Sequence, residues 1–333
     1  MPDPILQLRE LLTRTPSSDQ FLRIIRLISA CEDPGQVEFL LDYAEQHLGS
    51  WPDHTRAIRI PCPQHPWWRL ARSCQLNQNE EDLREYEHIT QLLLFMNGAS
   101  SVRSLDALKH LKSLTLAYTD HLESLNAITT HPTLTDLTFW SVSTADLDWF
   151  PPFFKLRRLS IINGNSLQSL QGIMQVPNVQ SLELLQCSSL EDIDALANHP
   201  SLETLVLKGR FDEMDDYLAN NTRYFEHEDN NPYQGLRRST DLNILQSIPN
   251  LKTLELHQSR ERSIFMLPSQ LEHLSLVQCD FTALLGLETL QNLQTLDLTG
   301  TTGVPLEKDE PRLYKNRSEV EVLQKRLKQK RRR

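Results

Sequence analysis

The sequence predicts an α/β solenoid, a repeat fold in which many short parallel strands stack into one sheet. Nine segments share one template: an aliphatic residue, two residues of any kind, a second aliphatic, one of any kind and a third aliphatic. All but one of the steps between their starts are 20 to 23 residues long. A fixed period in this range is typical of solenoids. The segments begin at Ile89, Leu111, Leu134, Leu156, Val179, Leu202, Leu251, Leu271 and Leu293.

The template has a simple physical reason. Its last two aliphatics are two residues apart, so they face the same side of a strand. One strand cannot bury them, whereas stacked strands build a continuous core in which each repeat contacts only its neighbours. Three repeats close on His131-Pro132, Val176-Pro177 and His199-Pro200, because proline stops a helical turn.

This pattern resembles the leucine-rich repeat family over about residues 89 to 303. The repeat length is most similar to the short, internalin-like class, whose members present a concave sheet to protein partners. The resemblance implies a horseshoe with a parallel β-sheet on its concave face. In the family the ninth repeat position is normally Asn or Cys. Because the residue type at this position varies here, the backbone groups of some turns must find other hydrogen-bond partners. That position reads Asn97, Thr119, Val142, Gly164, Cys187, Arg210, Ser259, Cys279 and Thr301.

Residues 1–50 differ in kind and predict a small all-α N-terminal domain. Apolar residues recur at helical spacing in three runs. Ser17 can cap the second helix, Pro34 opens the third, and Gly49 ends it. We interpret the domain as a cap over the first strand of the sheet. A separate partner-binding module is the alternative.

Residues 51–88 are expected to form a capping strand and a linker. Thr55, Ile58 and Ile60 give a degenerate copy of the template, and Trp67 and Trp68 are expected to pack over the first rung. A zinc site is an alternative, but its spacing matches no common zinc-finger pattern, and we predict no metal and no cofactor. The four candidate ligands would be Cys62, His65, Cys74 and His88.

The seventh position of each repeat should point away from the core and therefore form the concave surface. It is apolar in five consecutive repeats, at Phe95, Ala117, Trp140, Ile162 and Leu185, and then polar at Lys208 and His257. Exposed apolar patches of this extent usually mark a contact surface, and a central aromatic often dominates binding energy. The alternative is that the protein's own insertion or helical cap covers the stripe. The predicted partner-binding residues are Phe95, Met96, Tyr118, Trp140, Ile162, Leu185, Lys208 and His257.

Two further segments interrupt or follow the repeats. Residues 210–240, inside a 49-residue step, are predicted to be an acidic and aromatic insertion that covers the stripe or contacts the partner. Residues 304–333 predict a helix with a capping box at Ser318 and Glu321, followed by a basic tail. Seven of the last nine residues, 325–333, are basic. Nucleic-acid contact through this tail is possible but not favoured, because no comparable basic cluster occurs elsewhere.

Composition agrees with a soluble, ordered protein. The chain has 39% hydrophobic and 23% charged residues and a net charge of -10. It has no phosphate-binding glycine loop and no hydrolase or metalloprotease motif, so we predict that it is not an enzyme. No apolar run reaches membrane-spanning length, and five scattered cysteines favour the reducing cytoplasm.

We therefore predict a non-enzymatic protein-protein interaction module, a scaffold or adaptor that binds a protein partner on the concave face. The alternative is a regulatory or adaptor subunit of a larger complex, associated with nucleic acid through the basic tail. A second alternative is an enzyme with a site in residues 51–88 or in the insertion.

Overall fold

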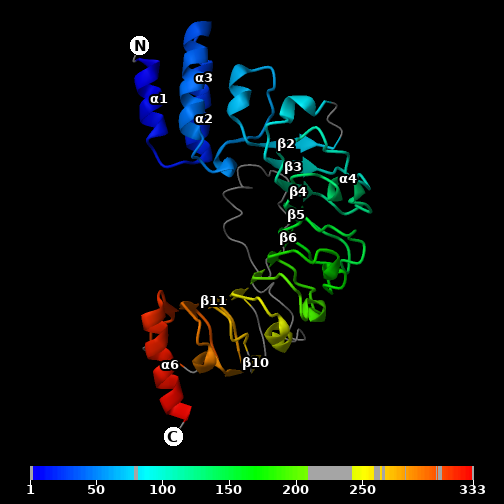
Figure 1. The fold of residues 1–333 in the computed structure, drawn as a ribbon, viewed down its shortest axis with the longest axis vertical. Coiled ribbons are helices and arrows are strands. Elements are labelled where there is room, and N and C mark those ends of the chain that lie inside the picture. The colour runs from blue at the N-terminus through cyan, green and yellow to red at the C-terminus, as the bar shows by residue number, and fades with distance from the viewer. Residues whose placement is uncertain are drawn as a thin grey trace. The chain divides into compact units, whose positions relative to one another are not determined.

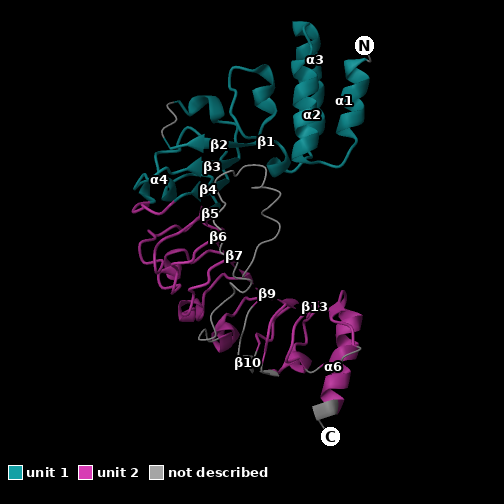
Figure 2. Cartoon of the chain, turned by 180° about the vertical axis from the view of Figure 1, so that it is seen from behind, with its two compact units in different colours: residues 1–118, 125–137 teal, residues 119–124, 138–333 magenta. Residues whose placement is uncertain are grey.

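The computed structural model describes residues 3–78, 82–208, 242–258, 263–264, 267–281, 283–304, 306 and 310–331. The chain divides into two compact units, unit 1 with residues 1–118 and 125–137 and unit 2 with residues 119–124 and 138–333 (Figure 2). The predicted insertion, residues 210–240, lies outside the described residues. Its proposed role over the concave stripe therefore stays a prediction.

Three helices begin unit 1, as the sequence predicts (Figure 1): α1 (Pro4–Leu12), α2 (Ser18–Ser29) and α3 (Pro34–Leu48). A side-chain oxygen caps the start of each helix. The Ser17 hydroxyl accepts a hydrogen bond from the Gln20 amide at 3.2 Å, and the carboxylates of Asp3 and Asp33 cap α1 and α3. The helices bury one apolar face each, formed by Leu8, Phe21, Ile24, Ile25, Ile28, Leu40, Leu41, Ala44 and Leu48.

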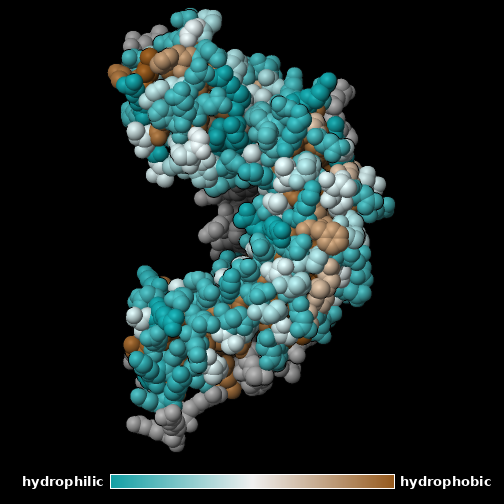
Figure 3. Space-filling model, viewed as in Figure 1, coloured by the Kyte–Doolittle hydropathy of each residue, from teal (hydrophilic) through white to brown (hydrophobic). Residues whose placement is uncertain are grey.

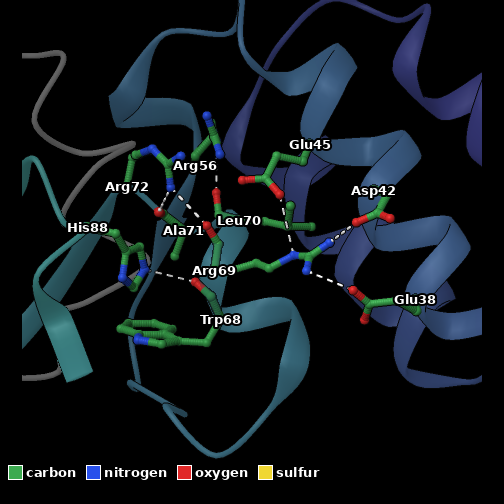
Figure 4. Close-up of polar contacts among 10 residues, drawn as sticks. All are labelled: Glu38, Asp42, Glu45, Arg56, Trp68, Arg69, Leu70, Ala71, Arg72 and His88. Carbon is green, nitrogen blue, oxygen red and sulfur yellow. Dashed lines mark hydrogen bonds and ion pairs between the residues drawn. The ribbon is translucent and has the colours of Figure 1, made fainter. Parts of the chain in front are cut away.

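A buried arginine joins α3 to the first strands. Arg56 follows η1 (Asp53–Thr55) and donates from Nε to the carbonyl of Leu70 at 2.8 Å (Figure 4). Its Nη1 donates to the carbonyl of Leu48 at 3.3 Å. The Leu48 carbonyl lies at the end of α3, where helix carbonyls lack partners inside the helix, and it also accepts from the Trp51 amide at 3.0 Å. Burial, reinforced by the charge of Arg72, lowers the pKa of Arg56 to about 10, so the side chain stays charged at neutral pH.

Arg69 makes a second connection, on the surface. It lies on η2 (Pro66–Leu70) and forms ion pairs with three carboxylates of α3 (Figure 4). Glu38 is 2.9 Å and Glu45 is 3.4 Å from its guanidinium, and Asp42 accepts a short hydrogen bond. Exposed pairs of this kind contribute little free energy individually. Together they connect α3 to the segment that leads into the sheet.

The strands of unit 1 run parallel and follow chain order: β1 (Ala57–Ile58), β2 (Ser73–Asn77), β3 (Gln91–Phe95) and β4 (Ser113–Ala117). β1 is the capping strand expected from the degenerate repeat, but it ends before Ile60, which is 78% exposed. β2 is an additional rung. Cys74 takes the place of an aliphatic there, is buried, and pairs with Leu92 of β3. The chain returns through η3 (Arg84–Tyr86) and α4 (Asn126–Thr129).

β5 (Asp136–Trp140) spans the boundary between the units. In unit 2 the parallel order continues with β6 (Arg158–Ile162), β7 (Ser181–Leu185), β8 (Thr204–Lys208), β9 (Thr253–His257), β11 (His273–Val277) and β13 (Thr295–Asp297). β8 pairs directly with β9, so the 49-residue step contains no further rung between them. The returning segments are η4 (Ile173–Gln175), η5 (Asp194–Leu196), η6 (Leu242–Ser247) and η7 (Leu287–Thr289), and β10 (Ser263–Ile264) pairs with β12 (Ala283–Leu284).

Thiols and hydroxyls at the ninth position hydrogen-bond backbone carbonyls in four of the repeats that lack the family asparagine, those of Thr119, Cys187, Cys279 and Thr301. The Cys279 thiol donates to the carbonyl of Leu256 at 3.2 Å, and the Thr119 hydroxyl donates to the carbonyl of Ser141 at 2.8 Å. The Cys187 thiol contacts the carbonyl of Ile161 at 3.8 Å, and burial raises its pKa to about 12. The ninth position can therefore accept a small polar side chain of several kinds.

The eighth position of the repeat has a backbone role that the sequence pattern did not reveal. It adopts a positive φ angle in most repeats, at Tyr118, Ser141, Asn163, Gln186, Gln258, Gln278 and Gly300. Its amide then donates to the carbonyl at the end of the next strand, as from Gln186 to Lys208 at 2.8 Å. Seven of the strands are thus followed by the same left-handed turn, namely β4, β5, β6, β7, β9, β11 and β13.

The C-terminal helix α6 (Arg317–Arg331) closes unit 2 after β14 (Leu313–Tyr314), which pairs antiparallel with β13. The predicted capping box at Ser318 and Glu321 is wrong by two residues. Asn316 accepts from the Glu319 amide at 3.1 Å, and the Glu319 carboxylate accepts from the Lys315 amide at 2.7 Å. The predicted apolar face is confirmed, since Val320, Leu323 and Leu327 are buried.

Candidate binding surface

The outward face of the strands consists of the third, fifth and seventh repeat positions, because the fourth and sixth are buried in the core. The parallel register aligns the seventh positions into a row. The predicted apolar stripe follows this row, but its residues are divided between the two units. Each part is therefore described by itself.

In unit 1 the row contains Phe95, whose neighbour in register is Ala117. The Phe95 ring stacks on the Tyr118 ring, with centroids 5.9 Å apart and planes inclined by 29°. Both side chains are half-buried, whereas Ala117 has no exposed area. Met96 is only 1% exposed, and its amide donates to the carbonyl of Ala117 at 2.9 Å. The accessible part of the predicted site in this unit is the stacked pair.

In unit 2 the register aligns Ile162, Leu185, Lys208 and His257 on β6 to β9. Leu185 is 4% and Trp140 6% exposed, although both occupy the seventh position. Ile162 remains half-buried and is therefore the apolar side chain of this group with accessible area. Trp140, the predicted anchor, keeps little surface for a partner in the isolated chain.

A charged cluster borders the apolar residues of unit 2. Lys208 and Glu255 form an ion pair at 3.0 Å, and both side chains are about one quarter to one third exposed. His257 Nε2 lies 3.8 Å from the Glu255 carboxylate and 3.4 Å from the Ser275 hydroxyl. Partial burial, followed by the charge of Lys208, lowers the pKa of His257, which keeps the ring neutral near pH 7. Lys208 and His257 thus share Glu255, whose place at the fifth, outward-facing position of the His257 repeat could have indicated it.

The register of the strands decides the fold class. One unit of 20 to 23 residues supplies one strand, one left-handed turn and one returning segment, repeated along the chain. The chain is a leucine-rich repeat solenoid. Its repeats have the short spacing of the internalin-like class, as the sequence indicated.

Comparison with known proteins gave matches among solved structures alone: no family model and no curated protein matches the chain. Among structures it is similar to the functional domain of InlJ from Listeria monocytogenes, at 15% identity and a TM-score of 0.42, over 75% of this chain and 47% of that one. It is also similar to the internalin InlF from the same organism, at 14% identity and a TM-score of 0.42, covering 90% and 85%. Internalin C2 of that organism gives 16% identity and a TM-score of 0.39, covering 67% and 76%. The chain spans about half the length of the InlJ structure.

Two of the four residues of the zinc alternative have other contacts in the described structure. Cys74 belongs to the core side of β2, and His88 Nε2 lies 3.0 Å from the Trp68 carbonyl oxygen. Within the described ranges, no three His, Cys, Asp or Glu side chains come together as a metal site. Trp68 packs against His88 and is buried, while Trp67 stacks on His65 and remains half-buried.

The remaining surface of the repeat protein is mainly hydrophilic in the view of Figure 3. Large exposed apolar side chains that lie off the outward face are scattered, among them Leu6, Phe39, Ile60, Phe154 and Met174. In the part of the chain that the structure describes, no helix is long and apolar enough to cross a membrane.

Proposed function

We propose that this leucine-rich repeat chain is a non-enzymatic module that binds a protein partner on the outward face of its strands. The observation that carries the proposal is the stacked pair of Phe95 and Tyr118. Two adjacent aromatic rings that are partly exposed offer a large rigid contact area at low cost in side-chain entropy. Residues of this type dominate the energy of many protein interfaces.

Unit 2 contributes its own part of the proposed surface. Ile162 supplies accessible apolar area, whereas Leu185, its neighbour in register, and Trp140 are buried. Lys208 and His257, linked through Glu255, supply polar groups beside it. An apolar centre with a polar rim is the usual composition of a protein interface. Met96 has too little exposed area to contact a partner and is assigned a packing role.

The proposal places the module in the cytoplasm as a scaffold or adaptor. All five cysteines are free thiols, and three of them, Cys74, Cys187 and Cys279, fill core positions of repeats. Buried reduced thiols suit a reducing compartment, where disulfides rarely form.

The test is affinity capture from an extract of the native cells, followed by measurement of the affinity for each captured protein in purified form. The bait is the full chain, compared with the double variant Phe95→Ala and Tyr118→Ala. Loss of two anchor rings should weaken binding by about 2 kcal/mol or more, roughly thirtyfold. The matched control is Phe154→Ala, an aromatic that is 63% exposed outside the strands. Equal affinity of the double variant and the wild type would overturn the assignment of this surface.

A further inference from the structure

Two basic side chains on the outward face of unit 2 lie around a single carboxylate oxygen. Oε2 of Glu255 on β9 is 3.0 Å from Nζ of Lys208 on β8. The same Oε2 is 3.8 Å from Nε2 of His257, further along β9. The three side chains are between 24% and 32% exposed, so they are accessible to a partner yet partly shielded from solvent.

The strands around β9 contribute the other polar groups that face His257. The Ser275 hydroxyl on β11 lies 3.4 Å from Nε2, and Asp297 on β13 adds a second acidic charge. Partial burial lowers the pKa of His257, and the charge of Lys208 lowers it further. The charges of Glu255 and Asp297 raise the same pKa. The ring therefore lies between opposing charges, and its protonation depends on both.

The net charge of these side chains depends on the protonation of His257. While the ring is neutral, the charges of Lys208 and Glu255 cancel. When the ring takes up a proton, Glu255 faces two cations, and the three side chains carry one net positive charge. Asp297 is two strands from β9 in the sheet order, so it offsets this charge less than Glu255 does. Because histidine changes its charge between about pH 5 and pH 8, a modest fall in pH makes this part of the surface cationic.

The row of seventh positions indicates which part of a partner would meet this cation. In register, the row leads from Ile162 and Leu185 on β6 and β7 to Lys208 and His257 on β8 and β9. Its apolar members are thus followed by two basic ones. Adjacent strands are about 4.8 Å apart, so a partner segment needs only about 10 Å to reach from Ile162 to Lys208. A segment that carries an apolar side chain and then an acidic one complements this row.

We propose, building on the function proposed above, that protonated His257 and Lys208 together bind an acidic side chain of the protein partner, and that this contact weakens when the ring is neutral. A basic partner group fits less well, because Glu255, which it would have to bind, already pairs with Lys208 at 3.0 Å. Protonation of His257 adds a cation beyond this pair, and the added charge attracts an acidic group.

Proton uptake links the affinity for the partner to pH. An acidic group beside His257 raises the pKa of the ring in the complex, so binding is accompanied by the uptake of a proton. The affinity therefore rises as the pH falls through the range between the pKa in the complex and the lower pKa in the free protein. We expect a rise of at least about threefold from about pH 7.5 to about pH 5.5, the size expected of one partly exposed ion pair.

The first experiment tests the coupling of the three charges in the full chain, without a partner. Proton–carbon NMR of the protein with isotope-labelled histidine rings follows the pKa of His257, and the signal that disappears in His257→Gln assigns it. Lys208→Met should raise this pKa and Glu255→Gln should lower it, each by about half a pH unit or more. An unchanged pKa in either variant, or a shift of the opposite sign, would overturn the proposal.

The second experiment measures the affinity for the captured partner, in purified form, at about pH 7.5 and about pH 5.5. Wild type is compared with His257→Gln and with His273→Gln. His273 is the matched control because it is an exposed histidine of the same outward face, with Nδ1 2.9 Å from Oγ1 of Thr295. Circular dichroism at both pH values checks that each variant is folded. Wild type and His273→Gln should bind at least about threefold more tightly at the lower pH, and His257→Gln should not.

Glu255→Gln gives a further check at about pH 7.5. It frees Lys208 from its carboxylate and should therefore bind an acidic partner more tightly than wild type does. The proposal is overturned if His257→Gln keeps the full rise in affinity at low pH, or if Glu255→Gln binds more weakly than wild type. The double variant Phe95→Ala and Tyr118→Ala judges the proposed function separately in the same assay. Failure to capture any partner would overturn the proposed function and this contact together.

Discussion

The Cys279 thiol donates a hydrogen bond to the backbone carbonyl of Leu256 at 3.2 Å, inside the buried turn of its repeat. The thiol adds a side-chain hydrogen bond to a carbonyl near the end of β9, and the bond links the turn after β11 to the neighbouring strand. A second polar side chain supports the same turn, since the Thr301 hydroxyl accepts from the Cys279 amide at 3.1 Å.

We predict that Cys279→Ala destabilises the fold by about 1 to 2 kcal/mol, because the buried turn would lose the thiol hydrogen bond and the packing of the sulfur atom. Urea unfolding followed by circular dichroism measures the change. Cys62→Ala is the matched control, since this thiol lies on a partly exposed loop and should change stability by less than about 0.5 kcal/mol. Equal effects of both substitutions would contradict the assigned role.

The burial of His199 leads us to predict that the stability of the fold depends on pH. The side chain has no exposed area, and burial lowers the pKa of its imidazole below the ordinary value of 6.5. Above pH 6.5 the ring is neutral in both the folded and the unfolded chain, so it adds no pH dependence to the free energy of unfolding. As the pH falls through about 6.5, the unfolded chain takes up a proton that the folded chain refuses, so stability falls.

The variant His199→Val should remove this part of the acid sensitivity, because Val176 occupies the corresponding place before proline in a neighbouring repeat. The free energy of unfolding, measured at about pH 7.5 and pH 5.5, should fall less in the variant than in wild type, by up to about 1.4 kcal/mol per pH unit. His121→Gln, at an exposed position, serves as control. An identical pH profile for wild type and His199→Val would refute this prediction.

Gly172 is a position where a side chain cannot be accommodated. Its φ angle is +94°, and an added Cβ would come within 2.3 Å of the Leu147 backbone carbonyl group. We predict that Gly172→Ala lowers the melting temperature and destabilises the fold by about 2 kcal/mol or more, from left-handed strain and collision with backbone. Gly35→Ala is the control, because its Cβ would make an ordinary contact at 3.5 Å. Differential scanning calorimetry measures the melting temperatures of the two variants, and the prediction requires a lower value for Gly172→Ala.

We predict that Trp140 contributes mainly to the stability of the fold and less to partner binding. The ring is 6% exposed, so Trp140→Ala should cost about 3 to 5 kcal/mol of unfolding free energy, as for other buried aromatics. Chemical denaturation of the variant measures this cost. A loss below about 1 kcal/mol with weakened partner capture would instead support Trp140 as the exposed anchor that the sequence suggested. For this reason Phe95 and Tyr118, and not Trp140, are chosen to test the binding surface.

The limits of sequence reasoning are visible at particular residues. The nine template segments identify their strands, and the apolar spacing identifies Val320, Leu323 and Leu327 as the packed face of α6. The rung at β2 was missed, because Ala71 and Cys74 fill aliphatic positions and the cysteine suggested zinc chemistry. The capping box was displaced, because several polar residues near the start of α6 can cap a helix and only the chain's path selects Asn316.

The sequence by itself determined which residues form each strand and which side of it is buried, because a period of two within strands and of 20 to 23 between them leaves one way to build a continuous core. Only the tertiary structure decided which outward residues remain accessible. The repeat pattern gives Phe95, Met96 and Trp140 similar expected roles, yet Phe95 stacks half-exposed on Tyr118 while the other two are buried. Exposure depends on atoms that neighbouring elements bring in from distant parts of the chain. No local pattern contains that information.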